Sequence, residues 1–465
     1  MTKKTIQIVF LCFLILVMGA CSGTKNLTKA DLQLPETFKG GNDSPMSIAD
    51  MSWRDFYTDS LLRKYIEITL ANNRDLLVAS EKVIELAELY GVVQKNLLPS
   101  VRGIVGETRE TNDYYGKKST VDPEISLKAT LNWEIDLWGG LAAARKQAGA
   151  KYMGSIEDRR AMQITLIAEV AKAYYNLVAL KNELNIVRQT LLTREQALEK
   201  SKLRFEGGLT SELIYQQAKV EYATTASLVP GLQNRITLRE NALNLLMGNL
   251  PDAPVAVNTA ALETDPGAIL PVGLPSQVLE NRPDLRSSEQ ALKAALANCG
   301  VVYSNQFPKL TLAITGGWEN DELKNFFRSP FSYILGNIAG TIFDFGRNKR
   351  KYKSSIAAYE QARLKYEKAV LAAFSEIDGA ISTYQEMRKT TNLRRELQDA
   401  AAKYVNLANL QYTGGSINYI DVLDAHRRYF DARTGFSNAV RDEYLAMVDL
   451  YKALGGGWSP EDDVK

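Results

Sequence analysis

The sequence NNRDL at residues 72–76 recurs as NRPDL at residues 281–285. Three more pairs follow in the same order, and the members of every pair are separated by roughly 210 positions, far more than the length of a solenoid repeat. They are LPS at 98–100 with FPK at 307–309, IDL at 135–137 with FDF at 343–345, and RFEGG at 204–208 with QYTGG at 411–415. Matched landmarks in constant order predict that one structural half is present twice in the chain.

Composition excludes several classes of function. Lys and Arg number 56 against 54 Asp and Glu, so the chain lacks the basic excess expected of a nucleic-acid-binding protein. The single histidine, His426, leaves no two-histidine metal site and no histidine relay elsewhere. No phosphate-binding glycine loop is present. We therefore expect neither an enzyme nor a bound cofactor or metal.

The N-terminus has the pattern of a bacterial lipoprotein signal. Two lysines precede the apolar run Ile6–Ala20, which is too short to span a bilayer comfortably. The run ends in MGAC at 18–21, which resembles a lipobox, and Ser22 after the cysteine favours delivery to the outer membrane. We predict that residues 1–20 are removed and that Cys21 carries acyl chains, each buried methylene contributing about 0.8 kcal/mol to anchoring. Simple secretion is the alternative.

Proline placement predicts where long helices lie. No proline falls between Glu124 and Val229 or between Phe331 and Ser459, and proline inside a helix costs about 3 kcal/mol. A helix over 141–203 would be about 90 Å long. Residues 250–275 contain five prolines and are expected to form an irregular connector.

The first proline-free stretch carries two apolar seams. One seam alternates spacings of four and three, which is the coiled-coil period, and a second lies on nearly the opposite side. A simple antiparallel bundle explains one seam, whereas two seams require neighbours on both sides. The first seam contains Leu166, Val170, Ala173, Leu177, Leu180, Leu184, Val187 and Leu191, and the second contains Ile164, Ile167, Ala171, Tyr174 and Val178.

The long helices are expected to end at two matched glycine pairs. Each pair supplies residues that tolerate the left-handed conformation and is followed by Ser, Thr or Asn, which cap the next helix. Each pair therefore closes a helical hairpin. The two tips are Gly207-Gly208-Leu209-Thr210-Ser211 and Gly414-Gly415-Ser416-Ile417-Asn418.

Short segments ahead of the long helices alternate with a period of two, which predicts strands. Apolar residues occupy every second position over 125–135 and over 310–318, and 101–110 and 331–343 are weaker candidates for their hairpin partners. Such alternation fits a soluble sheet with one wet face, but also the wall of a transmembrane β-barrel. Four strands cannot close a barrel lumen, and open edges are not tolerated in lipid. A barrel would need further copies of the chain.

Five sequence motifs of the chain resemble those of a known family, the outer-membrane efflux channels related to TolC. The match is to the lipoprotein (NodT-type) branch, which serves resistance-nodulation-division pumps, and it extends over residues 61–458. The motifs are WEIDLWG at 133–139, LENRPDLR at 279–286, IFDFGR at 342–347, YIDVLDA at 419–425 and LYKALGGGW at 450–458.

The resemblance implies a mainly α-helical homotrimer with a membrane β part. Three chains would share a twelve-stranded transmembrane β-barrel and a long α-barrel in the periplasm. Each chain would comprise a signal peptide (1–20), a lipid-anchored segment (21–60), a first repeat (61–249, β-hairpin about 101–136, tip 207–211), an equatorial connector (250–275), a second repeat (276–458, β-hairpin about 309–344, tip 414–418) and a tail (459–465).

The implied function is that of a passive exit duct in the outer membrane for small molecules such as drugs, toxic compounds or metal ions. A periplasmic adaptor and an inner-membrane resistance-nodulation-division pump would be its partners, so the chain itself needs no cofactor. Two alternatives remain open: a duct for secreted polypeptides, and a coiled-coil lipoprotein that only scaffolds the envelope.

The resemblance also implies a periplasmic gate at Asp421 and Asp424. Spaced i, i+3, the two carboxylates share a helix face, and threefold symmetry would gather six at a constriction, raising their pKa values and attracting cations. Alternatively, Asp421 is a first-turn residue behind an Asn418 cap. The latch arginine of some relatives corresponds to Ile417 here, so no Tyr412–arginine lock is predicted.

The hairpin tips correspond to the adaptor contact of the family. Glycines there permit close backbone approach, although they also serve as ordinary helix C-caps. The residues that match are Arg204, Gly207, Gly208, Leu209, Thr210 and Ser211 at the first tip, and Gly414, Gly415 and Ser416 at the second.

Overall fold

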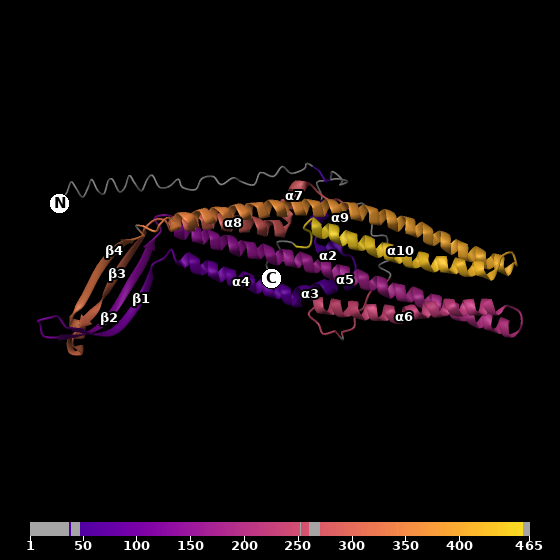
Figure 1. The fold of residues 1–465 in the computed structure, drawn as a ribbon, viewed down its shortest axis with the longest axis horizontal. Coiled ribbons are helices and arrows are strands. Elements are labelled where there is room, and N and C mark those ends of the chain that lie inside the picture. The colour runs from indigo at the N-terminus through magenta and orange to yellow at the C-terminus, as the bar shows by residue number, and fades with distance from the viewer. Residues whose placement is uncertain (1–36, 39–46, 252, 260–269, 342, 459–465) are drawn as a thin grey trace. The chain divides into compact units, whose positions relative to one another are not determined.

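The computed structural model describes residues 37–38, 47–251, 253–259, 270–341 and 343–458. The predicted signal peptide, Cys21 and the tail 459–465 lie outside these residues, as does much of the connector. Within the described ranges, no helix combines the length and the apolar character needed to cross a membrane. The described chain forms two compact units, one from 81–156 and 287–369, the other from residues up to 80 together with 157–286 and 370–458 (Figure 1).

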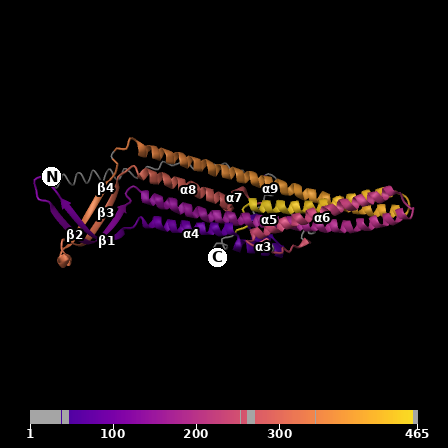
Figure 2. The same ribbon diagram turned by 60° about the horizontal axis from the view of Figure 1, so that its bottom comes forward.

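The first unit contains one four-stranded antiparallel sheet in the order β1-β2-β3-β4. Its strands are β1 (Ser100–Asn112), β2 (Thr120–Ile135), β3 (Lys309–Asn320) and β4 (Pro330–Ala339), which lie side by side in Figures 1 and 2. The predicted pairs of strands form hairpins, and β2 joins them by pairing with β3, with Leu131 opposite Ile314. The four strands predicted from alternation are therefore confirmed.

The predicted fourth strand, 331–343, is too long, because β4 ends at Ala339. Ala339 pairs with Lys309, so the next residue of β4 would pair with Pro308, which has no backbone N–H to donate. Gly340 lies so close to Pro308 that a Cβ there would come within 2.6 Å of it. The chain must leave the sheet at that point. The loop between β3 and β4 contains a short 3₁₀ helix, η3 (Leu323–Arg328).

The register places the apolar residues of neighbouring strands on one face of the sheet. Leu127 lies opposite Trp318, Leu131 opposite Ile314, and Ile314 opposite Ile334. This face is not covered by the rest of the described chain at its edges, where Ile334 on β4 is 71% exposed. On the other face, the Thr130 and Thr315 hydroxyls lie 3.0 Å apart and form a hydrogen bond.

The helices of the first unit begin directly after the sheet, and an aspartate caps each of the two long ones. Asp136 accepts hydrogen bonds from the N–H groups of Leu141 and Ala142 at the start of α5 (Gly140–Glu206). Asp344 accepts from Gly346 and Asn348 at the start of α9 (Arg347–Thr413). The recurring IDL and FDF sequences therefore mark two equivalent strand-to-helix transitions. Shorter helices α4 (Arg74–Lys95) and α8 (Pro283–Ser304) complete the unit.

The second unit contains two helical hairpins of equal dimensions, whose long helices α5 and α9 begin in the first unit. The 67-residue α5 is followed by the 35-residue α6 (Glu212–Leu246), and the 67-residue α9 by the 35-residue α10 (Tyr419–Ala453). Both views show each pair running together (Figures 1 and 2). The same unit also contains η1 (Ile48–Asp50), α2 (Trp53–Phe56), α3 (Ser60–Asn72) and α7 (Pro275–Asn281).

Both apolar seams of α5 are buried in the second unit, except for Ala173 and Leu191 of the first seam, which are half-buried. Leu177 in the first seam and Tyr174 in the second are each fully buried. The helix therefore has neighbours on two sides, as its pattern predicts. Towards the tip the burial decreases, and Leu192 and Leu203 are exposed.

Two buried polar side chains hold the ends of the returning helices. Asn73 Nδ2 donates to the carbonyl of Leu246, the last residue of α6, at 2.9 Å. Arg282 Nη1 donates to the carbonyl of Ala453, the last residue of α10, at 2.8 Å. These residues belong to the recurring NNRDL and NRPDL sequences, so the motif has the same structural role in both halves: it caps the carbonyl end of a long helix.

Arg282 keeps its charge although it is only 8% exposed. Burial opposes ionisation, but the Asp284 and Glu376 carboxylates, 2.7 and 2.8 Å from Nη2, outweigh that effect and raise the pKa of the guanidinium. A buried charge of this kind is stable only while its partners remain. The contact therefore fixes α8, α9 and α10 to one another at the base.

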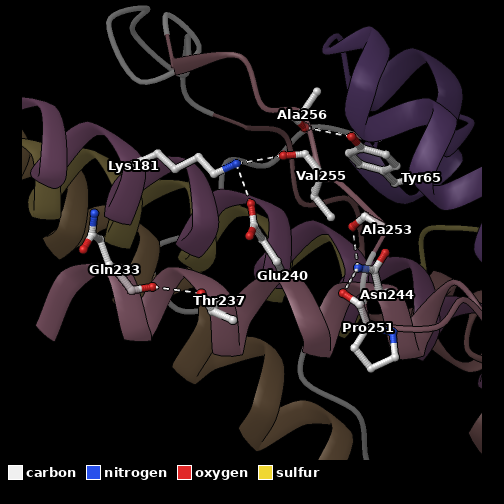
Figure 3. Close-up of polar contacts among 10 residues, drawn as sticks. All are labelled: Tyr65, Lys181, Gln233, Thr237, Glu240, Asn244, Pro251, Ala253, Val255 and Ala256. Atoms are coloured by element: carbon white, nitrogen blue, oxygen red, sulfur yellow. Dashed lines mark hydrogen bonds and ion pairs between the residues drawn. The ribbon is translucent and has the colours of Figure 1, made fainter. Parts of the chain in front are cut away.

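The connector is irregular where it is described, as predicted, and is tied to the surrounding helices (Figure 3). Lys181 on α5 donates to the Val255 carbonyl at 2.7 Å and forms an ion pair with Glu240 on α6, also at 2.7 Å. Asn244 donates to the Ala253 carbonyl at 2.8 Å, and the Tyr65 hydroxyl to the Ala256 carbonyl at 2.8 Å. Side chains thus satisfy carbonyls that have no partner in a helix or sheet.

The segment after α10 folds back over the base of the second unit. The Trp458 indole N–H donates to the Asn281 carbonyl at 3.1 Å, and its ring lies 4.5 Å from the Arg160 guanidinium. The close packing of this segment requires glycine at position 456, because a Cβ there would come within 2.3 Å of the Tyr451 ring.

We predict that Gly456→Ala destabilises the protein by about 1–3 kcal/mol, the usual cost of overpacking a closed site. Tyr451 cannot move aside easily, since it is 1% exposed and its hydroxyl donates to the Met51 carbonyl at 2.7 Å. A Cβ added at Gly379, inside α9, would meet no atom within 4 Å, so Gly379→Ala should instead stabilise by about 0.5–1 kcal/mol. Thermal unfolding of the purified protein in detergent measures both. Equal thermal unfolding midpoints for Gly456→Ala and Gly379→Ala would contradict the close packing of Gly456 against Tyr451.

Candidate functional site at the helical tips

Both hairpin tips have the predicted glycine turns. Gly208 and Gly415 have φ values of 70° and 75°, in the left-handed region. Leu209 N–H donates to the Arg204 carbonyl at 2.7 Å, and Ser416 N–H to the Gln411 carbonyl at 2.8 Å, which closes each preceding helix. At the first tip, Ser211 occupies the N-cap position of α6, but its side chain forms no capping hydrogen bond.

The tips expose apolar side chains to solvent in the described chain. Leu209 and Leu213 at the first tip are 73% and 69% exposed, and Leu410 and Ile420 at the second are also exposed. The predicted adaptor-contact residues at both tips are exposed as well, except for Thr210, which is half-buried. Exposed apolar residues gathered at a helical tip are a typical feature of surfaces that bind another protein.

The two hairpins meet through a tyrosine–arginine contact that the sequence did not predict. Arg204 Nη1 at the end of α5 donates to the Tyr412 hydroxyl at the end of α9, at 3.3 Å. The expectation that Tyr412 lacks an arginine partner is therefore wrong: the arginine comes from the other hairpin. Ile417, where some relatives have their latch arginine, instead packs against the buried cluster of Val405, Ala408, Val422 and Ala425.

A second tyrosine, Tyr419 at the start of α10, also contacts α5. Burial raises the pKa of its phenol, and a hydrogen bond with the Ser201 side chain lowers it in part. The rings of Tyr412 and Tyr419 lie 5.5 Å apart. The α9–α10 hairpin thus presents two phenols to α5 just behind the tips.

The two candidate gate aspartates lie in the first turns of α10, as predicted, but each is already engaged. Asp421 accepts a hydrogen bond from the Asn418 N–H at 3.1 Å, which is one half of a capping box. Asp424 forms ion pairs with Arg427 and Arg428, both at 2.6 Å. The Arg428 guanidinium, followed by Arg427, holds the pKa of Asp424 below its usual range. Within one chain this is the opposite of the shift expected for a ring of carboxylates.

A cavity of about 810 Å³ lies behind the tips, between α5, α6, α9 and α10. Its walls carry the cations Arg194, Lys200 and Arg433 and the carboxylate of Glu221. Arg194 forms an ion pair with Glu221 at 3.0 Å, and Arg433 donates to the side-chain oxygen of Gln189 at 3.0 Å. Apolar and aromatic side chains, Val405, Val422 and Phe430 among them, line the same cavity. Polar contacts and a small buried apolar cluster therefore both join the helices here.

His426 lines this cavity from α10. Burial lowers the pKa of its imidazole, and the positive charge of Arg194 lowers it further, so the neutral form is favoured in the folded protein. In the described part of the chain, no cluster of His, Cys, Asp or Glu could hold a metal ion. The position is consistent with the structural role expected for this histidine.

We predict that acidification from pH 7.5 to pH 5.5 destabilises the second unit through His426. An unfolded histidine takes up its proton near pH 6.5, whereas the folded one does so only at lower pH, so stability falls as the pH drops through that interval. His426→Gln keeps a neutral polar group and should reduce the loss of thermal stability on acidification. Because His426 is the only histidine, an unchanged pH dependence in the variant would exclude this explanation.

Comparison with known proteins shows a consistent similarity. The model of a family described as outer membrane efflux protein matches residues 65–249 and 274–456. The chain is 32% identical over 434 residues to the toluene efflux pump outer membrane protein TtgF of Pseudomonas putida, covering 90% of this chain and 88% of TtgF. It is 27% identical to the cation efflux system protein CusC of Escherichia coli over 451 residues, 95% of this chain and 97% of CusC.

The fold is also that of solved channel structures. The outer-membrane channel OprN superimposes with a TM-score of 0.85 over 93% of this chain and 99% of its own, at 24% identity. At that identity the likeness concerns the fold alone. It includes both the helical hairpins and the four-stranded sheet, as the high coverage of both chains requires.

Proposed function

Because the chain belongs to the outer membrane efflux protein family, we propose that it is the outer-membrane exit duct of a tripartite efflux pump. The observation that supports this most directly is the four-stranded sheet, which has one apolar face and two edge strands, β1 and β4, each with a single neighbour in the described chain. An isolated soluble sheet would leave this face and both edges exposed to water. A membrane barrel shared among copies covers them.

The proposed assembly is a homotrimer with a twelve-stranded transmembrane β-barrel and a helical barrel in the periplasm. In it, β4 of one chain would pair with β1 of the next, because open strand edges are not tolerated in lipid. The long helices would form the wall of the helical barrel. The two buried seams of α5 support this, because a helix in such a wall packs against a neighbour on each side.

We propose that each chain consists of two repeats, 61–249 and 276–458, joined by the connector 250–275. Three observations support a duplication. The family model matches twice, the two hairpins have the same helix lengths, and Asn73 and Arg282 make equivalent contacts. The segments 1–20, 21–60 and 459–465 would be the signal peptide, the lipid-anchored segment and a tail.

The proposed location is the outer membrane, with Cys21 as the acylated anchor. The names of the relatives place those proteins in the outer membrane, and the lipobox-like MGAC supports the anchor. TtgF is named for toluene and CusC for cations, so small molecules are the proposed cargo. The cargo would be delivered by an inner-membrane pump through a periplasmic adaptor. The exposed tip residues, Leu209 and Ser416 among them, would contact that adaptor.

The proposed gate lies at the tips. Three chains would bring Asp421 and Asp424 together as six carboxylates, and the Arg204–Tyr412 contact would hold the two hairpins of each chain together in the closed state. Opening would require this exposed hydrogen bond to break. The cavity behind it would leave fewer contacts to break as the hairpins separate.

Imaging of the protein extracted in detergent from outer membranes, with its mass determined in the same preparation, tests the proposed function. We expect elongated trimeric cylinders with a detergent belt at one end. Monomers without a detergent belt would contradict the channel and favour the scaffold lipoprotein. A trimer that restores secretion of a polypeptide, but not resistance to small toxic compounds, in a deletion strain would favour the secretion duct.

We predict that Tyr412→Phe raises the single-channel conductance of the protein in planar bilayers. The substitution removes only the hydroxyl that accepts from Arg204, a contact contributing about 0.5–1.5 kcal/mol per chain. Arg204→Gln should have the same effect, since both variants remove one contact. Tyr429→Phe is the matched control, because Tyr429 packs against the same buried cluster without taking part in this contact. Equal conductance in the wild type and Tyr412→Phe would show that the Arg204–Tyr412 contact does not hold the channel closed.

A further inference from the structure

Five basic residues crowd the start of α9, and all five are exposed. We call Arg347, Lys349, Arg350, Lys351 and Lys353 the basic collar. No acidic residue occurs from Phe345 to Tyr359, so this part of the helix carries only positive charge. The collar belongs to the first unit and begins eight residues after the last residue of β4, Ala339.

The rest of the described chain does not neutralise the collar. No carboxylate in the described ranges lies within ion-pair distance of any of its five side chains. The preceding acid, Asp344, accepts hydrogen bonds from the Asn348 and Gly346 N–H groups, and these, with a smaller contribution from the Arg347 charge, lower its pKa. Glu360, the next acid along the helix, forms its ion pair with Arg363.

Helix formation does not explain the collar, because cations at this position oppose it. Positive charge is unfavourable at the N-terminal end of a helix, where the helix dipole is positive. Arg347 and Lys351, and likewise Lys349 and Lys353, are spaced i, i+4, so like charges face one another. The equivalent helix α5, also capped by an aspartate, has no charged residue before Arg145. The transition from strand to helix therefore forms without cations.

Two exposed aromatic rings adjoin the collar. Phe343 and Phe345 are 73% and 86% exposed, and their ring centroids lie 4.5 Å apart. Phe345 has a φ of 54°, in the left-handed region that a bulky residue rarely adopts. The backbone thus holds an aromatic side chain outward immediately before the cations. Aromatic rings next to clustered basic side chains are typical of segments at the surface of an anionic membrane.

We infer that the basic collar, with Phe343 and Phe345, binds the headgroups of anionic phospholipids. The site rests on the proposed function, in which β4 lies in the membrane, so that the collar follows directly at its periplasmic surface. Arg347 and Lys351 lie on nearly the opposite side of the helix from Lys349 and Lys353, at 3.6 residues per turn, so in the proposed barrel one of these pairs faces outward at the level of the headgroups. The uncompensated positive charge, the two exposed rings and the position directly after β4 favour lipid over an acidic protein partner.

Native mass spectrometry of the full-length protein in detergent, with phosphatidylglycerol or phosphatidylcholine added at equal concentration, tests this inference. We expect the wild type to retain phosphatidylglycerol in at least fivefold preference, about the effect of a single engaged cation. The variant R347Q/K349Q/R350Q/K351Q/K353Q should lose the preference. The control K365Q/K368Q/K389Q/R394Q/K403Q removes five exposed cations farther along α9 and should keep it.

A measurement on the wild type alone keeps the test independent of how the variants fold. Raising the salt concentration from about 50 to about 500 mM should abolish the preference for phosphatidylglycerol, since the contact is between exposed charges. Equal retention of both lipids by the wild type at low salt would overturn the inference. A second result would also overturn the inference: the wild type shows no lipid preference, and the collar variant dissociates into monomers. The collar would then bind an acidic surface of a neighbouring copy. If the proposed trimeric channel is itself wrong, the mass spectra will show a monomer with either lipid, which distinguishes this failure from a lack of lipid preference.

Discussion

The arrangement of the helical hairpins depends on two buried hydrogen bonds to helix ends. Asn73 and Arg282 each satisfy the carbonyl of the last residue of a returning helix, Leu246 and Ala453. Both donors are buried, so losing either would leave a polar group without a partner inside the protein, at a cost of about 1–3 kcal/mol. Because these bonds fix where α6 and α10 end, they also fix where their tips lie, one helix length away.

The second unit is consequently held firmly at its base and loosely towards its tips. At the base, Arg282 is buried and paired with two carboxylates. Behind the tips, the helices line a cavity beside a small buried apolar cluster, and the Arg204–Tyr412 hydrogen bond is exposed. Exposed polar contacts contribute less than buried ones, because water replaces them readily. The distribution of contacts favours motion at the tips while the base stays intact, which is what a gate in that position requires.

The sequence was sufficient to predict features that depend on neighbouring residues, and insufficient for features that depend on residues far apart in the chain. The glycine tips, the strand alternation over 125–135 and the two seams of α5 all follow from neighbouring residues, and each was found as predicted. The end of β4 was missed because it is decided by Pro308, a residue of another strand. The partner of Tyr412 was missed because it lies about 210 positions earlier in the chain, and no local pattern links such residues. The carboxylate ring expected from Asp421 and Asp424 depends on contacts between chains and stays a prediction; within one chain, Asp424 is paired with Arg427 and Arg428.

The proposed duplication clarifies why the tip contact exists only once per chain. Arg204 corresponds to Gln411 and Tyr412 to Phe205, so one half supplies the guanidinium and the other the hydroxyl. The reciprocal pair, Gln411 with Phe205, has neither a guanidinium nor a hydroxyl group, so the contact forms once. The same divergence occurs at the strand-to-helix transitions, where the first seven residues of α9 contain the five cations of the basic collar and those of α5 contain two, Arg145 and Lys146. Asn73 and Arg282 at the base make the same contact in both halves although the residue differs, whereas Arg204 and Tyr412 at the tips make a contact that only one pairing of the halves supplies.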